Sequence, residues 1–575
     1  MIRRSNGRAW WWCVAAVVLA AGVGFFLLRA GTQAGPLPQD IELKKSDFMV
    51  FGGNYDVQAR EGFRPRADVA AVMLTHPVAW NMDPFHDRNW RYQLSAWRML
   101  NPIWSRWYGR DWSRLVAEVM PWVHDWYVYH VLLKRQSDFD WYDMAAGYRA
   151  QHLAMLLHLQ KEGLIALSPE QLSEVRTLAR LHIRKLRDPN FMTRGNHGIF
   201  QVHGLRLLCL SWPDEACRGE EAYSSKLMAN LLHSQFGSHG VHTENSPAYH
   251  LFALTIFSSL RPALYPSIER DFRQTLAEAR AVAPWFTLPD GKVAPMGDSA
   301  GSGASFPKSW RPSCSSRDHA GNCVISKDLV SAGYAVIRTA PGVPRAQASM
   351  LIVGGSTMAP KSHDHADELG FVLYDAGRPL LVDSGKYSYN KDRWRHYFTS
   401  DRAHNLVGLE GVVFGPSDTV TDGSALLGMS GQGNTYTING MVERAGGFRH
   451  RRRFVYQPGK SLTITDHVVA KRGSRPVAYW HLAPGVTARP TPDGVGLVAQ
   501  GVVVGHLVLR KGDCKLSVVK GRDSARIQGW VSPSYLRRVP AAVVEYHCAA
   551  DVQDIETEVM FGKRTTLETP GSTLR

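Results

Sequence analysis

The feature that most constrains the fold is a change in hydrophobic period about halfway along the 575-residue chain. Apolar residues recur at helical spacing between about residues 69 and 283. Short β-type segments separated by Gly, Pro, Asn or Asp follow from about residue 334. Residues 299–327, which are rich in Ser, Gly, Pro and Arg, lie between the two patterns. The chain is therefore expected to form a helical part first and an antiparallel β part second.

The helical part is expected to consist of antiparallel helical hairpins curled into a toroid, because helix-loop-helix units of similar length follow one another. The expected helices span residues 97–107, 112–133, 142–159, 169–186, 198–210, 221–235, 249–260 and 268–283. The β part is expected to be a large antiparallel sandwich, because many short strands follow without intervening helices. Its expected strands span residues 334–338, 348–353, 370–374, 380–382, 453–457, 462–470, 478–482, 503–509 and 543–548.

The N-terminus carries an unbroken apolar run at residues 9–28, preceded by Arg3, Arg4 and Arg8. A run of about 20 residues is long enough to span a bilayer. The basic flank is expected to stay in the cytoplasm, so the rest of the chain is exported to the periplasmic side and tethered to the inner membrane. A cleavable signal peptide is the alternative, because Thr32-Gln33-Ala34 resembles a small-residue cleavage site.

These patterns give the following domain organisation. We expect a cytoplasmic basic tail at 1–8, a transmembrane anchor or signal segment at 9–28, a linker and irregular entry at 29–68, the toroid at 69–298, a linker at 299–327 and the β-sandwich at 328–575.

Six cysteines in the exported part fall into three sequence-local pairs, as an oxidising compartment would allow. The pairs are Cys209 with Cys217, Cys314 with Cys323, and Cys514 with Cys548. The alternative of unpaired buried thiols stays open, because sequence alone does not establish connectivity.

The net charge of +16 indicates an acidic partner. The sequence has no zinc-finger spacing, RNP-type aromatic motif or basic recognition helix, so we expect no nucleic acid as partner. An anionic polysaccharide or the membrane surface fits an exported basic protein better. Excess Lys and Arg that only keep the surface soluble are the simpler alternative.

Residues 362–389 carry the densest cluster of chemically useful side chains. Alternation from His363 through His365 to Leu373, followed by a turn at 375–377, predicts a β-hairpin. Side chains two apart on a strand share a face, so the two imidazoles should point the same way. Asp383 is expected to meet them from the neighbouring strand. Imidazoles with a carboxylate suit a divalent metal or acid/base chemistry.

Two further polar clusters lie in the helical part. Arg194-Gly195-Asn196-His197 precedes a predicted helix, and Ser246 is expected to cap a helix begun by Pro247 with Tyr249 in its first turn. Another imidazole, His404, follows the hairpin. Taken singly, each cluster is typical of a loop with capping groups.

The clusters together resemble the heparinase II/III-like family of polysaccharide lyases and its alginate-lyase relatives. The matching residues, in order, are Asn196-His197, Glu244-Asn245-Ser246-Pro247 with Tyr249-His250, His363-x-His365-Ala366-Asp367, Asp383-x-Gly385 and Ala403-His404-Asn405. The resemblance implies an α+β multidomain fold, with an incomplete (α/α) toroid followed by an antiparallel β-sandwich and a substrate cleft between them. It also implies cleavage of a uronic-acid-containing polysaccharide by β-elimination, which gives 4,5-unsaturated products.

The resemblance assigns roles to individual residues. Asn196 and His197 would neutralise the substrate carboxylate. Tyr249 would protonate the leaving oxygen and, in a syn elimination, also act as the base, whereas His363 is the expected base in an anti elimination. The neighbouring Arg194, Glu244 and Arg395 are expected to bind substrate.

A structural zinc is also implied by the resemblance, with His365, Asp383 and His404 as ligands. Three N/O ligands with water suit zinc. The third ligand varies in spacing among relatives, so His481 is an alternative to His404.

Two other functions stay open at this point. A glycoside hydrolase would need two carboxylic residues, for which Glu244 with Asp143 or Asp298 are candidates. A non-catalytic exopolysaccharide-binding or assembly protein would be favoured if Tyr249 and His363 lay far apart. The sequence identifies neither the uronic acid, nor endo or exo cutting, nor the oligomeric state.

Overall fold

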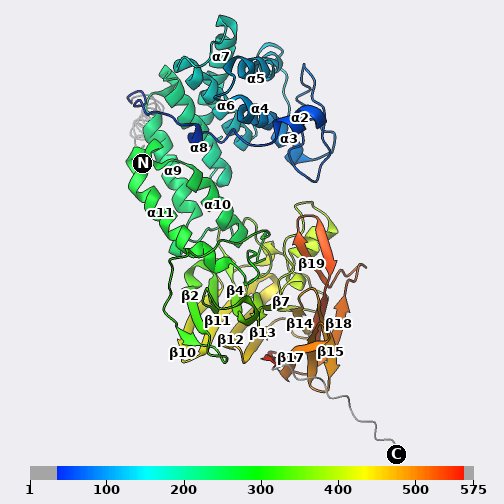
Figure 1. Cartoon of the computed structure of the whole chain (residues 1–575). Coiled ribbons are helices and arrows are strands. Elements are labelled where there is room, and N and C mark those ends of the chain that lie inside the picture. The colour runs from blue at the N-terminus through cyan, green and yellow to red at the C-terminus, as the bar shows by residue number, and fades with distance from the viewer. Residues whose placement is uncertain (1–34, 360, 563–575) are drawn as a thin grey trace, which may run out of the picture. The chain divides into compact units, whose positions relative to one another are not determined.

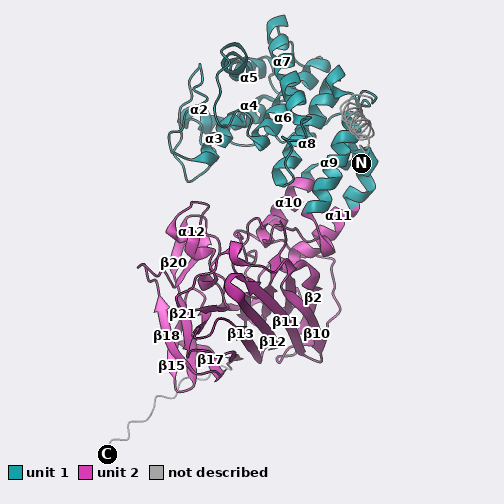
Figure 2. Ribbon diagram, turned by 180° about the vertical axis from the view of Figure 1, so that it is seen from behind, with its two compact units in different colours: residues 1–234, 259–273 teal, residues 235–258, 274–575 magenta. Residues whose placement is uncertain are grey.

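A computed structural model describes residues 35–359 and 361–562 of the chain (Figure 1). The chain divides into two compact units, one made of residues 1–234 and 259–273 and the other of residues 235–258 and 274–575 (Figure 2). The apolar segment 9–28 lies outside the described residues, so the expected anchor stays a prediction. Among the residues that are described, no helix combines the length and the apolar character needed to cross a membrane.

The first unit is helical, and every helix expected there is present. Its main helices are α2 Tyr55–Glu61, α3 Arg88–Ser95, α4 Asn101–Trp107, α5 Trp112–Tyr127, α6 Asp143–Lys161, α7 Pro169–Leu186, α8 Asn196–Ser211 and α9 Glu220–Gln235. Local capping explains several starts: Asp111 accepts from the Arg114 amide at α5, and Ser168 accepts from the Gln171 amide at α7. A capping residue just outside the helix thus fixes where α5 and α7 begin.

Helices α6 and α8 form the centre of this unit, and both are buried on nearly all sides. Two glycines let them approach closely. A Cβ at Gly147 would collide with the Phe200 carbonyl group, and a Cβ at Gly204 would collide with the Gly147 carbonyl oxygen. This contact matters for the site because Asp143 begins α6 and Asn196 begins α8.

Two fully buried histidines in this unit should make its stability depend on pH. Burial lowers the pKa of His182 to about 3, helped by the Arg149 charge, and burial lowers the pKa of His203 to about 4. Unfolded histidine has a pKa near 6.5, so at pH 5 the unfolded chain binds protons that the folded chain cannot. Each residue should therefore lower the free energy of unfolding by about 2 kcal/mol between pH 7.5 and pH 5.

Thermal unfolding at the two pH values measures this effect. His203→Gln, which removes the titrating ring, should show a smaller drop in melting temperature on acidification than the parent protein. An equal drop in both proteins would exclude His203 as a source of the pH dependence.

The second unit begins with helices and continues into β structure. Its helices are α10 Pro247–Ser259, α11 Glu269–Val282, whose first turn belongs to the first unit, and α12 Arg393–Phe398. Residues 274–298, which the sequence pattern places in the helical part, group with the strands, because Trp285, Phe286 and Met296 share one apolar cluster with Tyr334 and Ile352. The segment expected to be a linker also contains strands, namely β1 Ser316–Arg317 and the start of β2 Cys323–Leu329.

The β structure is antiparallel throughout its described pairs, as expected. The six-stranded sheet has the order β1-β2-β3-β4-β6-β7, the eight-stranded sheet β10-β11-β12-β13-β22-β17-β16-β15, and the four-stranded sheet β18-β21-β14-β8, with two small pairs β19-β20 and β5-β9. The bounds are β3 Tyr334–Thr339, β4 Met350–Gly354, β5 Ser356–Thr357, β6 Phe371–Asp375, β7 Arg378–Leu381, β8 Val407–Leu409, β9 Gly423–Ser424, β10 Leu426–Gln432, β11 Thr435–Arg444, β12 Phe448–Gln457, β13 Ser461–Val469, β14 Pro476–His481, β15 Val486–Thr491, β16 Gly494–Ala499, β17 Val502–Lys511, β18 Cys514–Lys520, β19 Trp530–Ser534, β20 Arg537–Pro540, β21 Ala542–Cys548 and β22 Asp554–Phe561.

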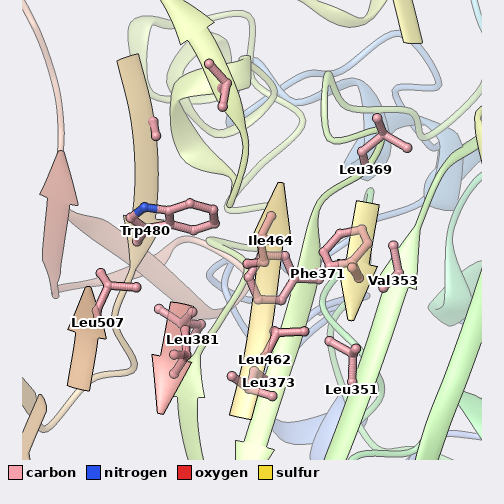
Figure 3. Close-up of a cluster of buried hydrophobic side chains, with 14 of the residues drawn as sticks. Leu351, Val353, Leu369, Phe371, Leu373, Leu381, Leu462, Ile464, Trp480 and Leu507 are labelled. Carbon is pink, nitrogen blue, oxygen red and sulfur yellow. The ribbon is translucent and has the colours of Figure 1, made fainter. Parts of the chain in front are cut away.

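One apolar core joins these sheets. Leu351 and Phe371 of the six-stranded sheet, Ile464 and Leu507 of the eight-stranded sheet and Trp480 of the four-stranded sheet all belong to it (Figure 3). Sheets that share one core in this way pack face to face, which gives the loops at their edges a rigid base.

The three expected disulfides are confirmed. Sulfur atoms lie 1.98 Å apart in Cys209–Cys217, 2.08 Å apart in Cys314–Cys323 and 2.00 Å apart in Cys514–Cys548. In the last pair the two residues face each other on β18 and β21.

Candidate active site

The hairpin expected at residues 362–389 is only partly present. Strands β6 and β7 form its arms, but residues 363–369 form an irregular loop. His363 and Leu369 adopt left-handed φ angles of 56° and 69°, which interrupt an extended strand. The expectation that His363 and His365 share a strand face was therefore wrong, although the loop still brings both rings to one carboxylate.

That carboxylate is Asp298. His363 Nδ1 lies 3.1 Å from Asp298 Oδ2, and His365 Nε2 lies 3.0 Å from Asp298 Oδ1. Arg395 Nη2 donates to Oδ2 at 3.0 Å, and its Nη1 donates to Oδ1. Although burial opposes ionisation, the hydrogen bonds from these groups hold the pKa of Asp298 far below its usual range. Asp298 is thus ionised, and both of its carboxylate oxygens contact the two imidazoles and the guanidinium.

Gly297 allows Asp298 to reach this position. Its φ is 53°, and a Cβ there would collide with the backbone oxygens of Asn245 and His363. The adjacent amides are used as well: Gly297 N donates to Asp367 Oδ2 at 2.8 Å, and Asp298 N donates to the His363 carbonyl at 3.0 Å. A short glycine-containing turn therefore ties the 298 segment to the 363–367 loop.

Helix α10 presents Tyr249 to the same loop. The helix begins at Pro247, as the sequence predicts, and the Ser299 hydroxyl accepts from the Ala248 amide at 3.1 Å. The weaker Ser246 cap, with its Oγ 3.5 Å from the Tyr249 amide, is hydrogen-bonded to Ser299 Oγ at 2.8 Å. The segment that carries Asp298 therefore also helps to fix the first turn of α10.

Tyr249 and His363 lie face to face, with ring centroids 3.5 Å apart and an interplanar angle of 16°. The Tyr249 hydroxyl lies 2.8 Å from the Tyr389 hydroxyl. Burial raises the pKa of Tyr249 far above 10, and Tyr389, Asp298 and Glu244 raise it further. In the absence of substrate Tyr249 therefore carries its proton, which suits a general acid.

The residues expected to bind substrate take different positions. The Glu244 carboxylate is buried, with Oε2 3.7 Å from His363 Nε2. Arg395, because both its terminal nitrogens donate to Asp298, acts on the imidazoles through that carboxylate. Tyr389 is a site residue that the sequence pattern did not single out; its only signal was proximity to Asp383 in a Tyr-rich loop.

The other predicted residues lie in the helical unit, around the first turn of α8. Asn196 and His197 are its first two residues, after Gly195 at the cap position. His197 Nδ1 lies 3.0 Å from Asp143 Oδ1, so this carboxylate orients the ring. The positive end of a 16-residue helix favours an anion, and no side chain caps this end. Arg194 is exposed just before the turn.

The second imidazole cluster fits a divalent metal. Single ligand atoms of His365, Asp367 and His404 all lie within 4.8 Å of one another. His365 Nδ1 and His404 Nε2 are buried, and no group in the described part of the chain hydrogen-bonds to either, as expected for nitrogens that face a cation. The other nitrogen of each ring faces a carboxylate: Asp298 lies against His365, and Asp383 Oδ2 lies 2.6 Å from His404 Nδ1. Such carboxylate–imidazole pairs support metal ligands in many zinc sites.

The geometry thus brings His365 and His404 together and adds Asp367, while Asp383 lies behind His404. Asp383 also accepts from the Gly385 amide at 2.9 Å. The alternative ligand His481 has both nitrogens engaged: Nδ1 lies 3.3 Å from Ser384 Oγ, and Nε2 lies 3.0 Å from the Arg402 carbonyl.

Metal analysis of purified protein tests this centre. We expect about one zinc per chain, and His404→Ala should lower the metal content at least tenfold because one of few ligands is lost. Asp367→Asn and Asp383→Asn distinguish the roles of the two carboxylates. Loss of a carboxylate that binds the metal directly should lower the metal content more than loss of a carboxylate that only contacts a ligating imidazole. His481→Asn serves as the matched control, and equal, negligible metal in all proteins would remove the site.

Comparison with known proteins agrees with a helical part followed by a β part. Residues 54–311 match the family model described as heparinase II/III N-terminus, and residues 325–559 match the one described as heparinase II/III-like, C-terminal. No curated protein is significantly similar in sequence.

Solved structures with the same fold include heparan sulfate lyase HepC from Pedobacter heparinus, which is 16% identical with a TM-score of 0.60 over 93% of this chain and 86% of that one. A crystal structure of heparinase III is 16% identical with a TM-score of 0.64 over 92% and 87% of the two chains. Another heparinase III is 17% identical with a TM-score of 0.62 over 92% and 86%. The TM-scores show that this chain shares their fold.

Proposed function

Because the chain belongs to the heparinase II/III-like family of polysaccharide lyases, we propose that it cleaves a uronic-acid-containing acidic polysaccharide by β-elimination. The observation that carries the proposal is the stacking of Tyr249 on His363, at 3.5 Å between ring centroids, with Asp298 behind the imidazole. A base and an acid are therefore held side by side. HepC is named as a lyase of heparan sulfate, which is a polyanion, and the net charge of +16 also agrees with a polyanion as substrate.

In this reaction a base removes the proton at C5 of the uronic acid, a double bond forms between C4 and C5, and the C4–O bond breaks. The leaving oxygen then takes up a proton. The ionised Asp298 accepts from His363 Nδ1, which leaves His363 Nε2 as the lone-pair nitrogen that takes the C5 proton. Asp298 also stabilises the imidazolium that results. Tyr249, whose raised pKa keeps it protonated, gives its proton to the leaving oxygen.

The negative charge that develops beside the substrate carboxylate must also be neutralised. We assign this role to Asn196 and His197 at the start of α8, where amide donors and the helix dipole favour an anion. A zinc held by His365, His404 and a carboxylate would supply a fixed positive charge that organises the loop. His363 and the metal ligand His365 are then held through one shared residue, Asp298.

The other two functions are less well supported. A hydrolase needs two carboxyl groups free to act on the glycosidic bond, but either partner proposed for Glu244 is already engaged. Asp298 binds two imidazoles and one guanidinium, and Asp143 Oδ1 lies 3.0 Å from His197 Nδ1. A non-catalytic binding protein was expected to separate Tyr249 from His363, whereas these rings stack. Export to the periplasmic side through residues 9–28 stays part of the proposal, and fractionation of cells that express the full chain tests it.

The decisive experiment incubates the protein with a panel of uronic-acid polysaccharides and follows the ultraviolet absorbance of the unsaturated product. We expect absorbance to rise with at least one acidic glycan. If reducing ends accumulate without absorbance, the protein is a hydrolase, and if neither appears, the lyase proposal is wrong.

A further inference from the structure

Lys386 is a half-buried cation beside the proposed proton-transfer residues. Its Nζ lies 3.4 Å from the Tyr389 hydroxyl, which in turn lies 2.8 Å from the Tyr249 hydroxyl. Across residues 35–359 and 361–562, no carboxylate lies within 4.0 Å of this ammonium group. Burial lowers the pKa of Lys386. The negative charge of Asp298 opposes this shift, and the positive charge of Arg395 adds to it. A partly desolvated ammonium group without an anion gains free energy when one binds.

Arg395, the neighbouring cation, is not available to pair with a bound anion. Arg395 donates both terminal nitrogens to Asp298, so its charge is already balanced. The nearby Asp298 charge is likewise used by Arg395 and two imidazoles. Lys386 therefore contributes a positive charge at this end of the site that no carboxylate of the described residues neutralises.

Two exposed tyrosines flank the Lys386 ammonium group. Tyr389 is 45% exposed and Tyr535 is 38% exposed, and their ring centroids lie 6.0 Å apart. The ammonium group lies 5.1 Å from the Tyr389 centroid and 5.9 Å from the Tyr535 centroid. Exposed aromatic rings of this kind pack against the C–H faces of sugars.

Backbone hydrogen bonds fix the second tyrosine in place. Tyr535 lies at the tip of the β19–β20 hairpin. The Ser532 amide donates to the Ser384 carbonyl at 2.8 Å, and the Leu536 amide donates to the Tyr387 carbonyl at 2.8 Å. The hairpin tip is therefore held against the loop that carries Lys386, so the three side chains form a preorganised surface.

We propose that Lys386, Tyr389 and Tyr535 form a subsite that binds an anionic sugar unit next to the unit held at Tyr249. The tyrosine rings contact the sugar face, and the ammonium group pairs with its carboxylate or sulfate. The inference rests on the proposed function, because the shared hydroxyl contact between Tyr389 and Tyr249 places the subsite directly beside the elimination chemistry.

The test measures binding and turnover separately in the full chain. Tyr249→Phe protein is titrated with a heparan sulfate hexasaccharide, its desulfated counterpart and an alginate hexasaccharide, with and without Lys386→Gln. Loss of one charged hydrogen bond should weaken binding about 10- to 100-fold. In the otherwise wild-type protein Lys386→Gln should raise KM by a similar factor and change kcat much less. Weakening for all probes identifies the carboxylate as the bound group, and weakening only for the sulfated probe identifies sulfate.

Lys391→Gln is the matched control, because Lys391 is an exposed lysine of the same loop and its loss removes the same charge. Lys386→Arg should retain most of the affinity, and melting temperatures show whether each variant is folded. Tyr535→Ala should weaken binding without changing net charge. Equal weakening by Lys386→Gln and Lys391→Gln would overturn the subsite, because it would show only a general charge effect.

The outcomes separate the subsite from the lyase proposal. Cleavage by wild-type protein, with unchanged affinity in Lys386→Gln, removes the subsite and keeps the lyase. Binding that depends on Lys386, without unsaturated product, keeps the subsite and removes the lyase. Absence of both binding and cleavage removes both.

Discussion

Tyr249→Phe is expected to lower lyase turnover by about 10²–10⁴-fold, the usual effect of losing a general acid. The substitution keeps the ring that stacks on His363 and removes only the hydroxyl that contacts Tyr389. Stability should therefore change little. The measurements are kcat from product absorbance and the melting temperature of the same preparation.

Two controls make this result specific. Tyr456→Phe removes a hydroxyl from the buried core of the β structure and should leave turnover unchanged. Tyr389→Phe removes the partner hydroxyl and should cost less than Tyr249→Phe, because Tyr389 contacts the reacting atoms only through its neighbour. Folded Tyr249→Phe protein with ordinary turnover would contradict the mechanism.

The helices from α4 to α11 could be predicted well because their signals are local, whereas the short helices α2, α3 and α12 were not predicted. The Ser168 cap with Pro169 and the Asp111 cap mark helix starts directly in the sequence, and Pro247 marks the start of α10. These signals do not depend on distant residues, so periodicity and capping were sufficient.

Several strands were missed because tertiary packing overrides their local signals. Asn439-Gly440 is typical of a turn, yet it lies in the middle of β11, paired with Arg453 and Arg452 of β12. A Cβ at Gly440 would collide with the Leu369 side chain, so the glycine serves the packing beneath the sheet. Only the folded structure shows that contact.

The site shows the same division between local and distant information. Motif order identified Tyr249, His363 and His404, because each lies in a short cluster of polar residues. The role of Asp298 was not visible, since its partners His363, His365 and Arg395 lie 65 to 97 residues away in the chain. Its neighbour Gly297 was the one available sign of an unusual backbone, and glycines are common in this sequence.

The central role of Asp298 leads to the second large expected effect. His363→Ala should lower kcat by about 10²–10⁴-fold if His363 is the base. Asp298→Asn keeps the side-chain volume and removes the charge that fixes the His363 tautomer and stabilises its imidazolium. It should lower kcat by a comparable factor, with KM changed less. A modest loss in His363→Ala would instead leave both proton transfers to Tyr249.

The double variant decides whether the two residues act as one unit. If Asp298 acts through His363, the loss in the double variant should be close to that of His363→Ala alone, because groups that work together are strongly non-additive. Zinc content must be measured in each protein, since Asp298 also contacts His365. Multiplicative losses at unchanged zinc content would show that Asp298 acts independently of His363, and the proposed base would then have no carboxylate partner.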